Sequence, residues 1–137
     1  MEQDTQLQDM QKLNIERLNT LAKAESDISV LWLYGSRARG TYSAQSDYDL
    51  AVAYDTFLSD PLEARLRPEL LALEWQNKLG IELSVLDINK APLPLAFTVI
   101  NDDVALYVRD GLRKCMEEKR IMSMWELDYQ YSRKHYA

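Results

Sequence analysis

Two apolar runs, residues 28–34 and 48–54, stand on either side of a polar segment that begins with Gly-Ser and ends just before Asp-x-Asp. The runs read ISVLWLY and YDLAVAY, and their β-branched and aromatic residues favour buried strands. Gly35 stops the first run, while Asp47 and Asp49 flank the start of the second. Any fold of this chain must therefore accommodate two carboxylates at the head of a buried strand.

The two carboxylates predict a cation site. Residues i and i+2 of a strand point to the same face, so Asp47 and Asp49 are expected side by side, with Tyr48 on the other face. Neither aspartate has a lysine or arginine next to it in sequence. Two unpaired carboxylates on one face repel each other, and a divalent cation removes that penalty. Carboxylate oxygens are ligands that Mg²⁺ prefers, so we expect a magnesium site here.

The Gly-Ser pair predicts a phosphate site beside the cation. Gly35 has no side chain, which lets a ligand approach the backbone, and neighbouring N–H groups can then face a phosphate. The Ser36 hydroxyl is a further donor, and Arg37 and Arg39 can carry charge to phosphate oxygens. We therefore expect Gly35, Ser36, Arg37 and Arg39 to bind a triphosphate that the two aspartates hold through Mg²⁺.

A third acid would complete a two-metal centre. The later run 81–88, IELSVLDI, reads as a third strand and carries Glu82 and Asp87 at opposite parity, so only one can face the metal. We prefer Glu82, because Asp87 sits at the exit toward the loop at residues 89–90. The predicted catalytic and metal-binding set is Asp47, Asp49 and Glu82.

The remaining pattern predicts an α+β fold, a small mixed β-sheet flanked by helices in a single domain of residues 1–137 with a core at about 28–110. Pro68 lies inside the second long helical segment and predicts a kink or a break into two helices. The other elements that we expect are helices at about 6–24, 61–79, 92–100 and 112–135 and a strand at 104–108.

Composition limits the setting and the partners. The formal net charge is −6, so direct nucleic-acid binding is not expected. Cys115 is the only cysteine, which excludes an internal disulfide. The N-terminus is polar and acidic, so it is not a signal peptide, and no apolar run approaches the ~20 residues that span a membrane. We therefore expect a soluble, cytoplasmic protein that does not associate with membranes.

The spacing Gly35-Ser36, ten residues, then Asp47-Tyr48-Asp49 resembles the nucleotidyltransferase pattern of the DNA polymerase beta-like superfamily. The later stretch IELSVLDINKAPLPLAFTVINDDVALYVRD is similar to the second half of its minimal nucleotidyltransferases (MNT). The resemblance implies a palm-like fold, two Mg²⁺ ions and ATP as substrate. It also implies phosphate contacts by Gly35 and Ser36, metal contacts by Asp47 and Asp49, and a basic residue near the nucleotide at Arg39. Glu82 is the nearest match to the family's third acid.

Many such proteins are antitoxins of a HEPN-domain ribonuclease. The resemblance therefore implies transfer of AMP from ATP to a tyrosine hydroxyl of that toxin, with Asp49 or Glu82 accepting the proton. Two alternatives stay open: an antitoxin that acts by contact alone, and a nucleotidyltransferase acting on a small molecule or an RNA end. Modification of the chain's own tyrosines also stays open.

The C-terminal helix is rich in large side chains. Part of it is expected to form a partner surface, although Trp125 and Tyr129 could instead pack on the sheet. The side chains concerned are those of Met122, Met124, Trp125, Tyr129, Tyr131 and Tyr136.

Overall fold

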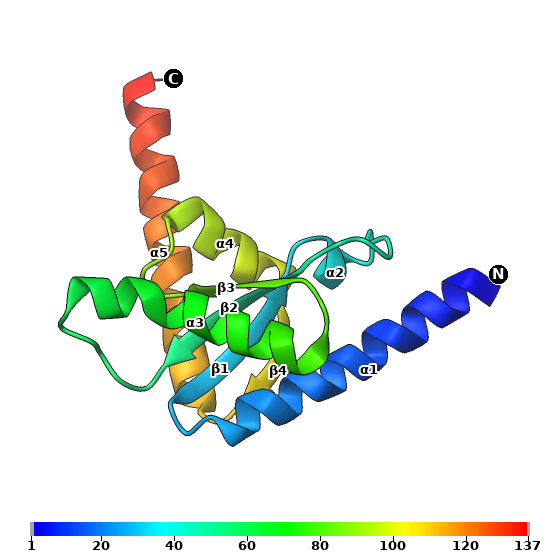
Figure 1. Ribbon diagram of the computed structural model, residues 1–137. Helices are drawn as coiled ribbons and strands as arrows, with labels where there is room; N and C mark the ends of the chain where they lie inside the picture. The colour runs from blue at the N-terminus through cyan, green and yellow to red at the C-terminus, as the bar shows by residue number, and fades with distance from the viewer. Residues whose placement is uncertain (1, 137) are drawn as a thin grey trace.

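The computed structural model describes residues 2–136 and, within them, the side chains up to residue 134. Helices and strands alternate along the described chain, which begins and ends with a helix, as Figure 1 shows. The elements are α1 (Glu2–Ala24), β1 (Ile28–Tyr34), α2 (Ser36–Arg39), β2 (Tyr48–Tyr54), α3 (Pro61–Leu79), β3 (Leu83–Asp87), α4 (Leu93–Asp102), β4 (Val104–Val108) and α5 (Gly111–Tyr136). No helix within this described range combines the length and apolar character needed to cross a bilayer.

The four strands form one mixed sheet in the order β3-β2-β1-β4. The neighbours of β1, namely β2 and β4, run antiparallel to it, while β3 runs parallel to β2. A parallel pair needs a crossover connection, and α3 supplies it. The predicted α+β class with a small mixed sheet is confirmed.

Helices cover both faces of the sheet, so each face has its own core (Figure 1). Residues of α1 and α3, with Trp75 at the centre, pack on one face. Residues of α4 and α5 pack on the other, around Trp32 and Ile121. Because β1 and β2 are central strands, nearly all their side chains are buried, which explains why both segments are continuous apolar runs.

Helix α3 is continuous through Pro68, so the predicted break into two helices is wrong. Asp60 caps its start by accepting hydrogen bonds from the N–H groups of Leu62 and Glu63. Pro68 is buried on the helix face that also buries Leu71 and Trp75. Packing of this face against the sheet offsets the hydrogen bond that proline cannot donate.

Helix α5 extends beyond the sheet, and its C-terminal half projects from the body of the molecule (Figure 1). Trp125 stacks on Phe97 of α4 with ring centroids 4.2 Å apart, so it packs on a helix and not on the sheet. Met122, Met124, Tyr129 and Tyr131 are exposed. The predicted partner surface on this helix stays a prediction, and the side chain of Tyr136 lies outside the described part.

Candidate active site

Gly35 joins β1 to α2 in a conformation that only glycine adopts readily. Its φ is +80° and its ψ is −156°. A Cβ added there would lie 2.6 Å from Oδ2 of Asp49. The Gly-Ser turn and the Asp-x-Asp segment are therefore in direct contact, and the absence of a side chain at Gly35 makes room for the Asp49 carboxylate.

Asp49 lies in a row of three polar side chains that crosses β1, β2 and β3. Tyr34 is its register partner on β1, and Ser84 is its partner on β3. The Ser84 hydroxyl donates to Oδ1 of Asp49 at 3.0 Å. All three residues lie on the sheet face that α4 and α5 cover, at the end of the sheet where β1 finishes and β2 begins.

The electrostatics of this row suit a bound cation. Burial raises the pKa of Asp49; the hydrogen bond from Ser84 lowers it, the charge of Asp47 raises it and the charge of Arg39 lowers it, with a net rise. Burial and the nearby Asp49 carboxylate raise the pKa of Tyr34 to about 12. Asp47 is exposed and lies close enough to act on Asp49, as alternation along the chain predicts. Two neighbouring carboxylates, of which Asp49 is half-buried and disfavoured in its charged form, are a donor set that fits Mg²⁺.

Arg39 and Asp102 lie beside the Gly-Ser turn. Asp102 is the last residue of α4, and its Oδ2 accepts the N–H of Gly35 at 2.8 Å. The same oxygen lies 3.3 Å from Nη1 of Arg39. Arg39 is thus next to the predicted phosphate position, with its side chain more than half exposed.

Arg37 points away from this group and braces the loop at residues 40–47. Its guanidinium is buried and lies over the rings of Tyr42 and Tyr48, 4.6 and 4.3 Å from the centroids. Nε and Nη2 donate to the carbonyl of Ser46, and Nη1 donates to the side chain of Gln11 in α1. These contacts favour a structural role for Arg37 over the predicted contact with phosphate.

The two candidates for a third acid lie at opposite ends of β3, and Glu82, whose carbonyl accepts the N–H of Tyr48, is the one next to the Asp-x-Asp segment. Glu82 is exposed, precedes β3 by one residue and lines a cavity beside α1. Asp87 is buried at the far end of β3, opposite Val52, where it faces Arg67 at 3.9 Å. Within residues 2–136, no three His, Cys, Asp or Glu side chains form a group that could hold one metal ion.

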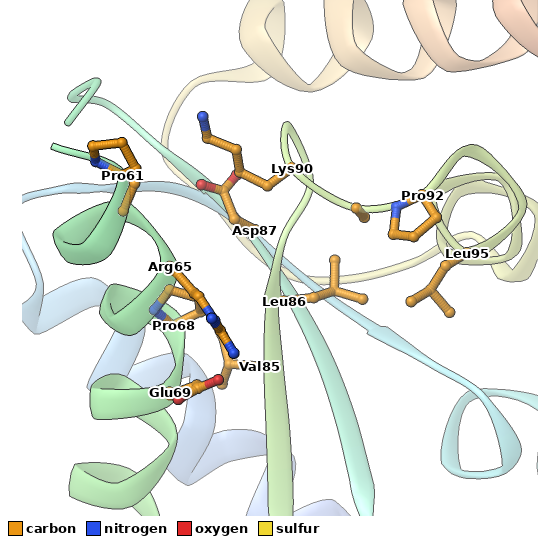
Figure 2. A pocket seen from close by; sticks show the side chains of 12 residues that line it. Pro61, Arg65, Pro68, Glu69, Val85, Leu86, Asp87, Lys90, Pro92 and Leu95 are labelled. Atoms are coloured by element: carbon orange, nitrogen blue, oxygen red, sulfur yellow. The ribbon is translucent and has the colours of Figure 1, made fainter. Parts of the chain in front are cut away.

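A separate apolar cavity of about 420 Å³ lies between α3 and the start of α4, with β3 along its floor (Figure 2). Pro61, Pro68 and Pro92 shape its walls, and Asp87 and Lys90 lie at its rim. None of the residues that line it belongs to the Gly-Ser or Asp-x-Asp segments. The Gly-Ser and Asp-x-Asp segments therefore lie outside this cavity, toward the other end of β3, where Ser84 pairs with Asp49.

Two residues of the site, Ser84 and Asp102, escaped the sequence analysis. Ser84 lies two residues after Glu82 and so points to the same face of the sheet. A predicted strand that began at residue 83 in place of 81 would have indicated Ser84 as the polar side chain on that face. Asp102 gives no comparable signal, because only the packing of α4 against β1 brings it within reach of Gly35.

The sequence profile described as "Polymerase beta, Nucleotidyltransferase" matches residues 16–111. A curated relative, the protein adenylyltransferase MntA of Aphanizomenon flos-aquae (strain 2012/KM1/D3), is 30% identical over 90 residues. That match covers 61% of this chain and 59% of the relative, so the chain spans about three fifths of the length of the curated relative.

Solved structures of toxin–antitoxin complexes contain chains of similar fold. One is a chain of a complex of tri-AMPylated Shewanella oneidensis HEPN toxin with MNT antitoxin, with a TM-score of 0.69, 18% identity and coverage of 90% of this chain and 93% of that chain. Another comes from a toxin–antitoxin structure with AMP-PNP, with a TM-score of 0.67, 19% identity and coverage of 90% and 91%. The fold, the contact between Gly35 and Asp49 and the family match agree: this chain belongs to the polymerase beta nucleotidyltransferase family.

Proposed function

We propose that this protein is an antitoxin that transfers AMP from ATP to a tyrosine hydroxyl of a cognate HEPN ribonuclease toxin. The observation that carries the proposal is the contact between the Gly-Ser turn and Asp49, with Asp47 beside it. Support for the acceptor and the partner comes from the relative named as a protein adenylyltransferase and from the structural neighbour in a complex with an AMPylated HEPN toxin.

In the proposed reaction the tyrosine oxygen attacks the α-phosphorus of ATP in line with the leaving pyrophosphate. A new oxygen–phosphorus bond forms and the bond from the α-phosphorus to the bridging oxygen breaks. The tyrosine proton passes to a carboxylate, for which Asp49 is the half-buried candidate and Glu82 the exposed one. The product is a phosphodiester that places a charged AMP group on the toxin.

Each site residue has a distinct part in this proposal. Ser36 and the backbone of the Gly-Ser turn orient the triphosphate, and Arg39 supplies a positive charge to its oxygens. Asp47 and Asp49 would hold Mg²⁺, which supplies positive charge next to the phosphates when bound. Asp47, Asp49 and Asp102 outnumber Arg39, so the site as it stands repels an anionic nucleotide, and cations are needed for binding.

The test is intact-mass spectrometry of a co-purified HEPN partner after incubation with this protein, ATP and Mg²⁺. The proposal predicts mass gains in steps of one AMP group. The gains should be absent with the Asp47→Asn/Asp49→Asn double variant, which keeps the side-chain shapes and removes both charges. A matched control, Asp9→Asn/Glu16→Gln, removes two exposed carboxylates from α1 and should leave the gains unchanged.

Other outcomes identify the alternatives. A tight complex with a silenced ribonuclease and no mass gain would mean inhibition by contact alone. If the two proteins formed no complex and the partner gained no mass, the proposal would be overturned. The search would then turn to small-molecule or RNA acceptors. Mass gain on this protein alone, without a partner, would show modification of its own tyrosines.

A further inference from the structure

Asp102 is a buried carboxylate at the edge of the proposed phosphate site. It ends α4, and the next residue, Asp103, has a left-handed φ of 54° that turns the chain into β4. Its side chain is only 6% exposed, although it lies next to an open site. A buried carboxylate needs partners that satisfy its charge, and two donors supply that need.

The two donors belong to Gly35 and Arg39, which the proposed function places beside the nucleotide. Oδ2 of Asp102 accepts the backbone N–H of Gly35 at 2.8 Å. Nη1 of Arg39 lies 3.3 Å from Oδ2 and 3.4 Å from Oδ1. The Asp102 carboxylate therefore lies where a phosphate oxygen could accept hydrogen bonds from the same donors.

We infer that Asp102 is a positioning residue that pins the Gly35 turn permanently and holds Arg39 only until the nucleotide binds, when Arg39 passes from Asp102 to the triphosphate. The inference rests on the proposed function and deepens it, because the bond of Asp102 to Gly35 persists when the nucleotide binds whereas its bond to Arg39 breaks.

Burial and exposure explain why the two bonds differ. Asp102 is buried at the end of a packed helix, and the N–H of Gly35 belongs to the backbone of a buried residue, so that bond has no freedom to exchange. The Arg39 side chain is 54% exposed, and its long stem can swing at little cost. At 3.3 Å and with its cationic side exposed to solvent, this ion pair is weak enough for a triphosphate with its Mg²⁺ to compete for Arg39.

The test is calorimetric binding of α,β-methylene-ATP with Mg²⁺, a nucleotide that cannot transfer AMP because a methylene group replaces the bridging oxygen. Asp102→Asn keeps an acceptor for Gly35 but releases Arg39, so it should bind the nucleotide about two- to five-fold more tightly than the wild type. In an Arg39→Ala background the same change should give only the smaller gain that comes from removing one negative charge near the nucleotide. Asp103→Asn is the matched control, since it removes the same charge from the adjacent exposed residue, and it should give a smaller gain that Arg39→Ala does not abolish.

Hydrogen exchange of the Gly35 amide tests the other bond. Protection should persist in Asp102→Asn and fall in Asp102→Ala, which has no acceptor. Two results would overturn the inference while wild-type binding still upheld the proposed function. One is equal or weaker nucleotide binding by Asp102→Asn, and the other is a gain that Arg39→Ala leaves undiminished. Failure of the wild type to bind the nucleotide would overturn both.

Discussion

Replacing Gly35 by alanine separates the two reasons for a glycine at this turn. The first is backbone strain, because a side chain at φ +80° and ψ −156° costs on the order of 1–3 kcal/mol. The second is a collision, because the new Cβ would stand 2.6 Å from Oδ2 of Asp49, whereas ordinary contact begins at 3.4 Å. The carboxylate must then move by about 0.8 Å, the difference between these two distances.

A shift of that size predicts a loss of function larger than the loss of stability. Displacement of a catalytic group by about 1 Å can lower a rate roughly 100-fold, so AMP transfer by Gly35→Ala should fall by about that factor. Gly40→Ala is the matched control, because Gly40 also has a positive φ, +78°, but an added Cβ there meets nothing within 4 Å. It should lose about 1–2 kcal/mol of stability and keep its transfer rate.

Urea unfolding monitored by circular dichroism gives the free energies, and a double-mutant cycle isolates the collision. Asp49→Ala removes the oxygen that Cβ would meet, so Gly35→Ala should cost less in that background by about 0.5–3 kcal/mol. Strictly additive costs would show that the two residues do not touch, and the account of the site built on their contact would then fail.

Three further substitutions test other contacts, two near the site and one between α5 and the loop that follows β3. Arg37→Met should destabilise the fold by about 1–3 kcal/mol, because the carbonyl of Ser46 loses its donors, and it should leave ATP binding intact. Weaker ATP binding at unchanged stability would instead support the predicted contact of Arg37 with phosphate. Ser84→Ala should raise the pKa of Asp49 further, since the Ser84 hydroxyl donates to that carboxylate, and a carbon-13 NMR titration that shows no rise would refute this. Burial raises the pKa of Glu117, but hydrogen bonds from Asn89, Arg120 and Arg113 outweigh burial and lower the pKa below its ordinary value. The charged carboxylate therefore stabilises the fold fully above about pH 4.3, the ordinary pKa of glutamate, and this stability is lost as the pH falls through the lowered pKa. Glu117→Gln should therefore lose about 1.5–3 kcal/mol at pH 7 and much less near pH 3, and an equal loss at both pH values would contradict the linkage.

The central hairpin was predictable because its signals are local. Strands β1 and β2 have the bounds expected from their apolar runs, since a buried central strand is apolar at nearly every position and Gly35 ends the first one. The short helix α2 was not expected, as a four-residue segment carries no periodicity that could reveal it.

The third side chain of the site depends on register, which sequence does not reveal. Alternation along residues 81–88 separated Glu82 from Asp87 correctly, and the structure places Asp87 on the opposite face from Asp49. Yet the residue directly opposite Asp49 is Ser84, and β3 starts only at Leu83. Pairing between β2 and β3 is set by the packing of α3, which joins them, so no local pattern could show which residue would face the aspartate.

The hydrogen bonds around the site differ widely in the length of chain that they close, and this has a consequence for folding. Gly35 and Asp49 are brought together by one hairpin, whereas Ser84 lies 35 residues from Asp49 and Asp102 lies 67 residues from Gly35. Contacts between distant residues carry a larger loop-closure entropy and tend to form later. A nascent or partly opened chain would therefore present the Gly-Ser and Asp-x-Asp segments together before α4 docks. The ability to hold a nucleotide in the correct geometry would then arise only with the last, most distant contacts of the fold.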